Sequence, residues 1–234
     1  MPGSRKGTPR GGQVPKTKVI VFDFDQTISQ CHVFKCLAGF VTLGRGNFLD
    51  GPYALSERGQ IQKCFEADEE MKGKFYEHCL GGKEQIAEME KTFKKLRTNG
   101  CSLVVCSKGL VAPIRLILEK TKLLPHFDDV YARIDDYTSM QDAREYDLNA
   151  MQTKFAPEVE THIDRKDCAK WSSKAEVCLK LANGRPCMLV EDDRDEIKKG
   201  EKAGLDTCFV KDRAGLTATE IGELLEWSAK KVES

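Results

Sequence analysis

Acidic and hydroxyl-bearing residues follow three short apolar runs of the sequence. Carboxylates placed together can bind a hard metal ion or attack a phosphorus atom, and hydroxyl groups can bind an anion. The residues concerned are Asp23, Asp25 and Thr27 after the run VIVF, Ser107 and Gly109 after the run SLVVC, and Glu191, Asp192, Asp193, Asp195 and Glu196 after the run CMLV. These three sets are the candidates for a chemical function.

The first set places two aspartates two positions apart. On an extended segment Asp23 and Asp25 point to the same face, so both can address one ligand. Their charges repel unless a cation lies between them, and Mg²⁺ prefers hard oxygen ligands of this kind. The acidic run at 191–196 is expected to complete the metal site. Cysteine and histidine are absent from all three sets, which favours Mg²⁺ over zinc.

This combination of residues suits phosphoryl transfer. A carboxylate such as Asp23 can act as the nucleophile and form an aspartyl phosphate, and Asp25 can handle the protons of both steps. Ser107, neighbouring backbone N–H groups and a lysine would stabilise the negative charge. Taken singly, each set has a plainer explanation as a loop cap or a solvated acidic turn. Their joint occurrence after three apolar runs favours an active site.

The apolar runs alternate with segments of helical period, a pattern typical of parallel strands joined by crossover helices. Strands are expected at 18–24, 101–106, 187–190 and 207–210 and within 125–134, and helices at 83–99, 110–124, 174–182, 196–203 and 217–230. Ligands of open parallel sheets bind at the carboxyl ends of the strands, where the three polar sets would meet. The predicted fold class is α/β, with a Rossmann-like parallel sheet flanked by helices.

Three segments depart from this alternation. Residues 1–17 are rich in glycine, proline and cations and are expected to form a disordered basic tail. Residues 29–82 hold several glycines between helix-like pieces and are interpreted as a small helical cap inserted after the first strand. Residues 135–170 are polar and show no pattern. The α/β core is therefore assigned to residues 18–28 and 83–234.

Composition narrows the class of protein. Hydrophobic residues make up 40% and charged residues 32% of the 234, as in ordinary globular proteins. No apolar run approaches the ~20 residues of a membrane span. Residues 1–18 hold five of the 37 basic residues and no acid, so the remainder, with 32 basic and 37 acidic residues, carries a net charge of −5. That balance disfavours a nucleic-acid partner, and ten cysteines without a C-x-x-C pair or a signal segment indicate a reducing cytoplasm.

Four segments together resemble the signature motifs of the haloacid dehalogenase (HAD) superfamily. DFDQT resembles the D-x-D-x-T motif that ends the first strand, and LVVCSKG the second motif, an apolar strand ending in serine or threonine. SSKAEV resembles the third, in which a lysine begins a helix, and LVEDDRDE the acidic fourth. The resemblance covers about residues 18–28 and 85–212 and implies a HAD-like core.

The resemblance implies a role for each matching residue. Asp23 would be the nucleophile and a metal ligand, and Asp25 would be the acid/base, with its backbone carbonyl facing the metal. The phosphate-binding residues would be Thr27, Ser107, Gly109 and Lys174. Asp192 and Glu196 would be further metal ligands. The function implied is that of a magnesium-dependent phosphatase that hydrolyses a small phosphomonoester. The dehalogenase branch of the superfamily lacks the acid/base carboxylate, so phosphoryl chemistry is favoured.

Two of these assignments have alternatives. In the fourth motif Glu191 stands where the family usually has glycine, so Asp193 is an alternative metal ligand. In the third motif two other lysines precede Lys174 and compete with it, Lys166 and Lys170.

The activity has alternatives as well. A phosphotransferase or phosphomutase would use the same residues, and a catalytically silent relative would keep the fold to bind a ligand or partner. An enzyme acting on phosphoproteins would need an open site, against which the long insertion argues.

Overall fold

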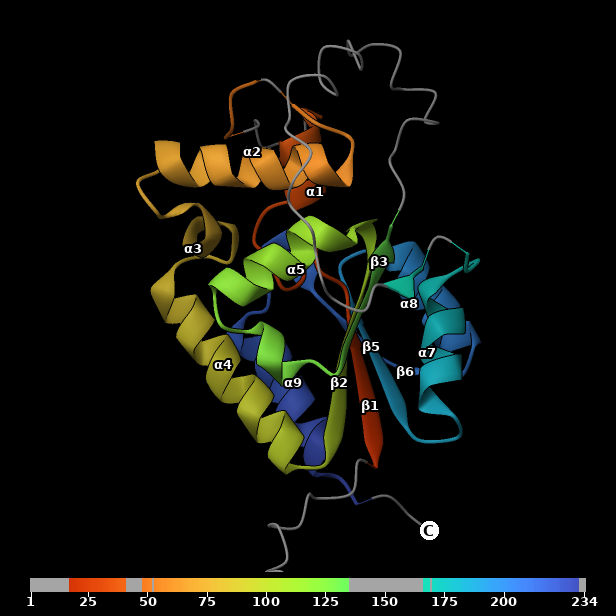
Figure 1. Cartoon of the computed structure of the whole chain (residues 1–234). Coiled ribbons are helices and arrows are strands. Elements are labelled where there is room, and N and C mark those ends of the chain that lie inside the picture. Colours follow the sequence, from red (N-terminus) through yellow and green to blue (C-terminus); the bar gives the residue numbers. More distant parts are fainter. Residues whose placement is uncertain (1–16, 41–47, 52, 135–165, 169, 232–234) are drawn as a thin grey trace, which may run out of the picture.

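A six-stranded parallel sheet forms the centre of the molecule (Figure 1). The computed structural model describes residues 17–40, 48–51, 53–134, 166–168 and 170–231. Its strands are β1 (Lys18–Phe22), β2 (Cys101–Leu110), β3 (Asp129–Arg133), β4 (Lys166–Asp167), β5 (Cys187–Glu191) and β6 (Asp206–Phe209). Their order is β4-β3-β2-β1-β5-β6, and every neighbouring pair is parallel. The predicted Rossmann-like α/β class is confirmed.

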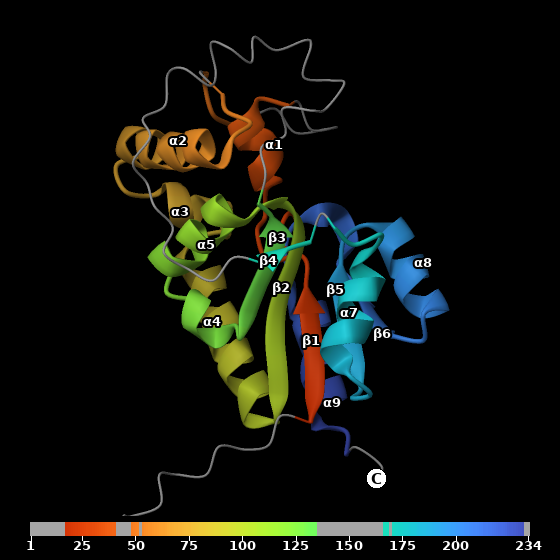
Figure 2. The same cartoon turned by 45° about the vertical axis from the view of Figure 1, so that its right-hand side comes forward.

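Helices cover both faces of the sheet (Figure 2). They are α4 (Lys83–Thr98), α5 (Val111–Lys120), α7 (Lys174–Ala182), α8 (Arg194–Lys202) and α9 (Ala218–Ala229), with short 3₁₀ turns at Leu124–His126 and Lys211–Arg213. Along β1, Ile20 and Phe22 face the side chains of α4, α5 and α9, and Val19 and Val21 face those of α7. This alternation follows from the two-residue period of a strand, and both faces are apolar because both are buried.

Local signals in the sequence explain where the helices begin and end. The hydroxyl of Ser173 caps α7 by accepting from the backbone N–H of Glu176. Thr217 and Glu220 form a reciprocal capping box at the start of α9. Both devices satisfy backbone donors that a helix leaves without partners in its first turn.

Several expected boundaries differ from the structure. β1 ends at Phe22 instead of residue 24, so Asp23 and Phe24 belong to the following loop. β2 continues to Leu110 through the SKG segment, and its register against β3 shifts between Cys106 and Leu110. The two-residue strand β4 was not predicted, since Lys166–Asp167 is polar and lies at the edge of the sheet.

The insertion at 29–82 contains three described helices, α1 (Val33–Ala38), α2 (Glu57–Glu70) and α3 (Phe75–Cys79). They lie beyond the carboxyl ends of the strands, with α2 packed on α5 (Figures 1 and 2). Leu37, Cys64 and Phe75 belong to the same apolar cluster as Ile20 and Phe22, so the insertion and the sheet share a core.

Two predictions concern residues that the structure leaves undescribed. The basic tail lies outside the described residues except for Thr17, whose backbone N–H donates to the Gly100 carbonyl over 2.9 Å. Most of the unpatterned segment, residues 135–165 and 169, also lies outside them. Among the described residues, none of the helices has the length and apolarity needed to cross a bilayer.

Candidate active site

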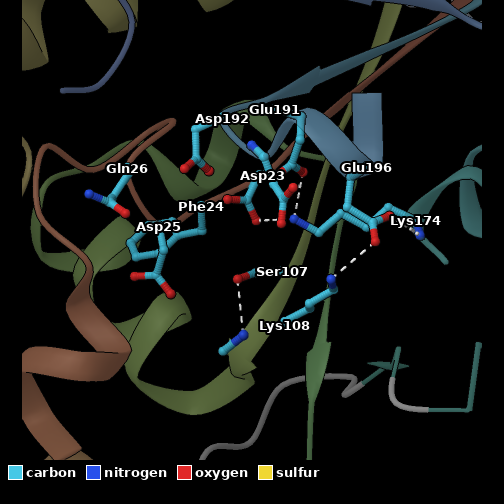
Figure 3. A network of polar contacts seen from close by, with 12 residues as sticks. Asp23, Phe24, Asp25, Gln26, Ser107, Lys108, Lys174, Glu191, Asp192 and Glu196 are labelled. Carbon is cyan, nitrogen blue, oxygen red and sulfur yellow. Dashed lines mark hydrogen bonds and ion pairs between the residues drawn. The ribbon is translucent and has the colours of Figure 1, made fainter. Parts of the chain in front are cut away.

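The residues that follow β1 and β5 meet those of the β2 end at the carboxyl edge of the sheet, as expected for parallel strands (Figure 3). They line a cleft of about 270 Å³. The lining residues are Asp23, Asp25, Gln26, His32, Phe34, Lys35, Ser107, Lys108, Gly109, Glu191, Asp192, Asp193 and Arg213. Members of all three polar sets therefore open onto one space.

A buried lysine joins two of the carboxylates. The Nζ of Lys174 lies 2.5 Å from Oδ1 of Asp23 and 2.6 Å from Oε2 of Glu191 (Figure 3). Lys174 and Asp23 each expose only 6% of their side chains and Glu191 2%, so water screens these pairs weakly. The structure thus places Lys174 at this position, whereas Lys166 pairs with Asp129 at 2.8 Å.

Burial perturbs the protonation of this group. It raises the pKa of Asp23 to about 6 against the opposing charge of Lys174, and it raises the pKa of Glu191 to about 8. Burial opposes the charge on Lys174, yet Asp23 and Glu191 outweigh it and hold the pKa of Lys174 well above its usual range. One cation therefore serves two carboxylates, with a third nearby, and the group carries an excess of negative charge.

These carboxylates fit a divalent cation. Oxygen atoms of Asp23, Glu191 and Asp192 lie within 4.8 Å of one another, and all three residues are buried. Burial raises the pKa of Asp192, although Arg213 opposes this with its Nε 3.3 Å from Oδ2. Hard oxygen donors with uncompensated charge suit Mg²⁺ or a similar ion. The donor chemistry is therefore compatible with a divalent metal ion.

Asp25 lies apart from the three clustered carboxylates. Its Oδ1 accepts from the backbone N–H of Phe34 over 3.3 Å, and its Oδ2 lies 3.3 Å from Nδ1 of His32. Both partners come from the start of the insertion, which fixes the orientation of this carboxylate. The side chain of Asp25 lines the cleft, so it can meet a bound ligand.

A tight loop turns the chain between the two aspartates and the insertion. Gln26 has a positive φ of 63°, and the backbone N–H groups of Ile28 and Ser29 both donate to the Phe24 carbonyl. The Thr27 carbonyl accepts from the N–H of Leu216, but the Thr27 hydroxyl has no hydrogen-bond partner among the described residues. Thr27 is fully buried and does not line the cleft, so its position suits holding the loop more than binding phosphate.

Ser107 and Gly109 line the cleft from the end of β2. The Oγ of Ser107 accepts from the N–H of Gly109 over 3.1 Å, which leaves the hydroxyl proton available to an anion. Lys108, between them, reaches Oε1 of Glu196 at 3.0 Å. Of the predicted phosphate-binding residues, Ser107 and Gly109 thus line one cleft with Asp23, and Lys174 reaches this group through its contact with Asp23.

Glu196 lies outside the three-carboxylate cluster. Its Oε1 accepts from Lys108 and Lys199, at 3.0 and 2.8 Å, and its Oε2 accepts from the backbone N–H of Lys174 at 3.1 Å. Burial disfavours its charge, but the hydrogen bonds from Lys199 and Lys108 outweigh this and hold its pKa at about 2. This geometry gives Glu196 a role in anchoring Lys174 and does not support the predicted role as a metal ligand.

Asp193 is engaged as a helix cap. Its Oδ1 accepts from the backbone N–H of Asp195 over 2.8 Å at the start of α8. Its own N–H donates to Oε1 of Glu191 over 3.3 Å. Among the described residues, Asp193 is not part of the three-carboxylate cluster, so the geometry favours Asp192 as the metal ligand.

Several residues of the cleft are not among those predicted from the sequence. His32 and Lys35 come from the insertion, and Arg213 comes from the turn after β6. None of the three belongs to a motif, although Arg213 lies three residues beyond the predicted strand at 207–210 and so shares the carboxyl edge of the sheet. The sequence does contain one signal for His32, which lies only a few residues after the DFDQT motif.

The perturbed carboxylates make stability depend on pH. We expect the free energy of unfolding of the metal-free protein to fall between about pH 4 and pH 8, because Asp23 and Glu191 have raised pKa values of about 6 and about 8. The stability from each raised pKa is complete below the unfolded value and is lost as the pH rises through the folded value. Thermal melts in EDTA would check this, and Mg²⁺ should restore more stability at the alkaline end. A melting temperature that rises across this range would contradict the prediction.

No family model matches the sequence, and no curated protein matches it. Solved structures do resemble the chain. A phosphoserine phosphatase in its apo form is 20% identical, with a TM-score of 0.44, over 91% of this chain and 99% of its own. A substrate-bound phosphoserine phosphatase is 19% identical, with a TM-score of 0.44, over 91% and 98%. A haloacid dehalogenase-like hydrolase from Streptococcus pneumoniae is 13% identical, with a TM-score of 0.38, over 88% and 90%.

Proposed function

We propose that this protein is a magnesium-dependent phosphatase of the HAD type that hydrolyses a small phosphomonoester through an aspartyl phosphate on Asp23. The observation that carries the proposal is the pairing of the buried Lys174 with Asp23, which lines a cleft together with Asp25 and Ser107. A nucleophile, a proton carrier and anion-binding groups thereby lie close together. The four motifs of the sequence that resemble the superfamily supply these same residues.

The residues divide the reaction into two displacements. A carboxylate oxygen of Asp23 attacks phosphorus while Asp25 gives a proton to the leaving oxygen, which departs as an alcohol. In the second step Asp25 takes a proton from a water molecule, and the water attacks the phosphorus of the aspartyl phosphate. This hydrolysis releases phosphate and regenerates Asp23. Lys174 and the Ser107 hydroxyl stabilise the negative charge of the transferring group in both steps.

A magnesium ion would be held by Asp23, Asp192 and the backbone carbonyl of Asp25. When bound, it supplies positive charge that neutralises the phosphoryl oxygens and orients them toward the nucleophile. Glu191 shares Lys174 with Asp23, so it sets the position and charge of that lysine.

The insertion at 29–82 serves as the cap of the site in this proposal. Phe34 and Lys35 of α1 line the cleft, and Phe34 also positions Asp25 through its backbone N–H. A cleft of about 270 Å³ under such a cap suits a small substrate better than a protein segment. All ten cysteines are free, which fits a reducing compartment such as the cytoplasm.

The direct test is hydrolysis of p-nitrophenyl phosphate by the purified protein, with Mg²⁺ and with EDTA. We expect turnover that requires the ion, because three acidic residues converge where the phosphoryl group would bind. Acetyl phosphate should be tried in parallel, because such a small phosphoryl donor needs few contacts with the cap. Folded protein that turns over neither compound with Mg²⁺ would contradict the proposal.

Gly109 offers a test of how closely the groups must fit. A Cβ added at Gly109 would lie 3.3 Å from Oδ2 of Asp25 and 3.4 Å from Cδ1 of Ile114. We expect Gly109→Ala to lower kcat by about ten- to hundredfold, because it displaces the proton carrier by a fraction of an ångström. The matched control is Gly222→Ala in α9, where the new Cβ meets no atom within 4 Å. It should keep full activity, and equal losses in both variants would contradict the expectation.

A further inference from the structure

A second cavity lies beside the cleft, on the other side of Lys108. It measures about 180 Å³ and shares Lys108 with the first. Its lining residues are Cys106, Lys108, Arg133, Cys168, Trp171, Ser172, Ser173, Lys174 and Val177. The reaction proposed above uses neither of its two cysteines.

The two thiols of this cavity lie close to each other. Cys106 is the last apolar residue before Ser107 on β2 and is completely buried, whereas Cys168 follows β4 and is partly exposed. The Sγ of Cys168 donates to the carbonyl of Ser107, the residue after Cys106, over 2.8 Å, and both thiols line the same cavity. A partly exposed thiol therefore lies beside a buried one.

The surroundings favour the thiolate of Cys168. The hydrogen bond with Cys106 lowers the pKa of Cys168, burial opposes this, and the charge of Lys174 lowers it further. The other partly exposed cysteine behaves differently. A hydrogen bond with Cys36 favours the thiolate of Cys31, but a hydrogen bond with Cys79 and burial outweigh it and raise the pKa of Cys31 well above its usual range. Thiolate character and access together decide which cysteine reacts.

We propose that Cys168 and Cys106 form an oxidisable pair, in which Cys168 reacts with a hydroperoxide and Cys106 then closes a disulfide. The Cys168 thiolate attacks the O–O bond of hydrogen peroxide, takes one oxygen as a sulfenic acid and releases water after proton uptake. The Cys106 thiol then attacks the sulfenic sulfur, forms the S–S bond and releases a second water. Two thiols lose two electrons in total, and the peroxide gains them.

Such a disulfide would affect the proposed active site. It removes the thiol proton that Cys168 donates to the Ser107 carbonyl, and it ties the end of β2 to the chain that enters α7. Ser107, which lines the proposed phosphate site, and Lys174, which contacts Asp23 there, lie on either side of this link. Oxidation at the second cavity would thereby alter the first.

The test is a peptide map of the full chain after treatment with hydrogen peroxide and alkylation of the remaining thiols. We expect a Cys106–Cys168 disulfide that dithiothreitol reverses. Without peroxide, iodoacetamide should modify Cys168 about tenfold faster than Cys31. The disulfide should be absent from Cys168→Ser and present in the control Cys31→Ser. A map in which Cys168 stays reduced, or in which Cys31 reacts as fast, would overturn the proposal.

Folding of the variants does not limit this test, because the disulfide and the alkylation rates are measured on the unaltered chain. The proposal also stands apart from the proposed function. If the chain forms this disulfide but hydrolyses no phosphate ester, the thiol proposal holds and the proposed phosphatase function fails. An active phosphatase without the disulfide overturns only the thiol site.

Discussion

Replacing Asp23 by asparagine is expected to reduce phosphate ester hydrolysis by about four orders of magnitude or more. The amide is nearly the same size as the carboxylate, but it cannot attack phosphorus to form an aspartyl phosphate. Asp23 is buried among Lys174, Glu191 and Asp192, so its negative charge adds to a crowded acidic group. The loss of activity is measured as kcat/KM for p-nitrophenyl phosphate with saturating Mg²⁺.

The fold should survive this change. Lys174 keeps Glu191 as a partner at 2.6 Å, so no buried cation is left without a carboxylate. The matched control is Asp193→Asn, which makes the same substitution in the same cleft at the cap of α8. Asparagine caps a helix about as well as aspartate, so we expect activity close to that of the unaltered protein. Comparable losses in both variants, or an active Asp23→Asn, would show that Asp23 is not the nucleophile.

Lys174→Met is the second large effect. We expect the unfolding free energy of the metal-free protein to fall by about 3 to 5 kcal/mol, because the methionine leaves Asp23 and Glu191 buried without a counter-charge. Turnover with Mg²⁺ should fall by about a hundredfold or more, since the phosphoryl group loses a positive partner. Denaturant unfolding in EDTA and steady-state kinetics measure the two effects separately.

A pH series identifies the cause of the instability. As the pH falls below the raised pKa values of Asp23 and Glu191, both carboxylates become neutral, so the difference between variant and parent should shrink. The control is Lys170→Met, at an exposed lysine shortly before α7 that should change neither stability nor activity. A stability loss that does not depend on pH would point to packing instead of charge.

The fold could be predicted from the sequence largely because the core strands are short apolar runs. VIVF, SLVVC and CMLV each became a central strand of the sheet. β4 was not predicted because its two residues are polar and form an edge strand, which needs no apolar run. The extension of β2 through Ser107–Leu110 was missed because serine, lysine and glycine are typical of loops, while the strand continues across a shift in register.

The candidate site was partly predictable for a related reason. The carboxyl ends of parallel strands meet at one edge, so residues next to apolar runs could be brought together without knowing any distance. That logic placed Asp23, Ser107 and Asp192 in one cleft. It was not extended to Arg213, in the turn after the strand at 207–210, and it could not show that the carboxylate of Glu196 reaches lysines and not the three-carboxylate cluster. Such details depend on side-chain directions that no periodicity encodes.

The central claim is that Asp23 accepts the phosphoryl group, and trapping that group tests it most directly. The protein is mixed with Mg²⁺ and acetyl phosphate or p-nitrophenyl phosphate, quenched in acid and mapped by mass spectrometry. We predict one added phosphoryl group on the peptide that contains Asp23, sensitive to hydroxylamine and missing from Asp23→Asn. Hydrolysis by a protein whose phosphoryl group lies on another residue would contradict the account.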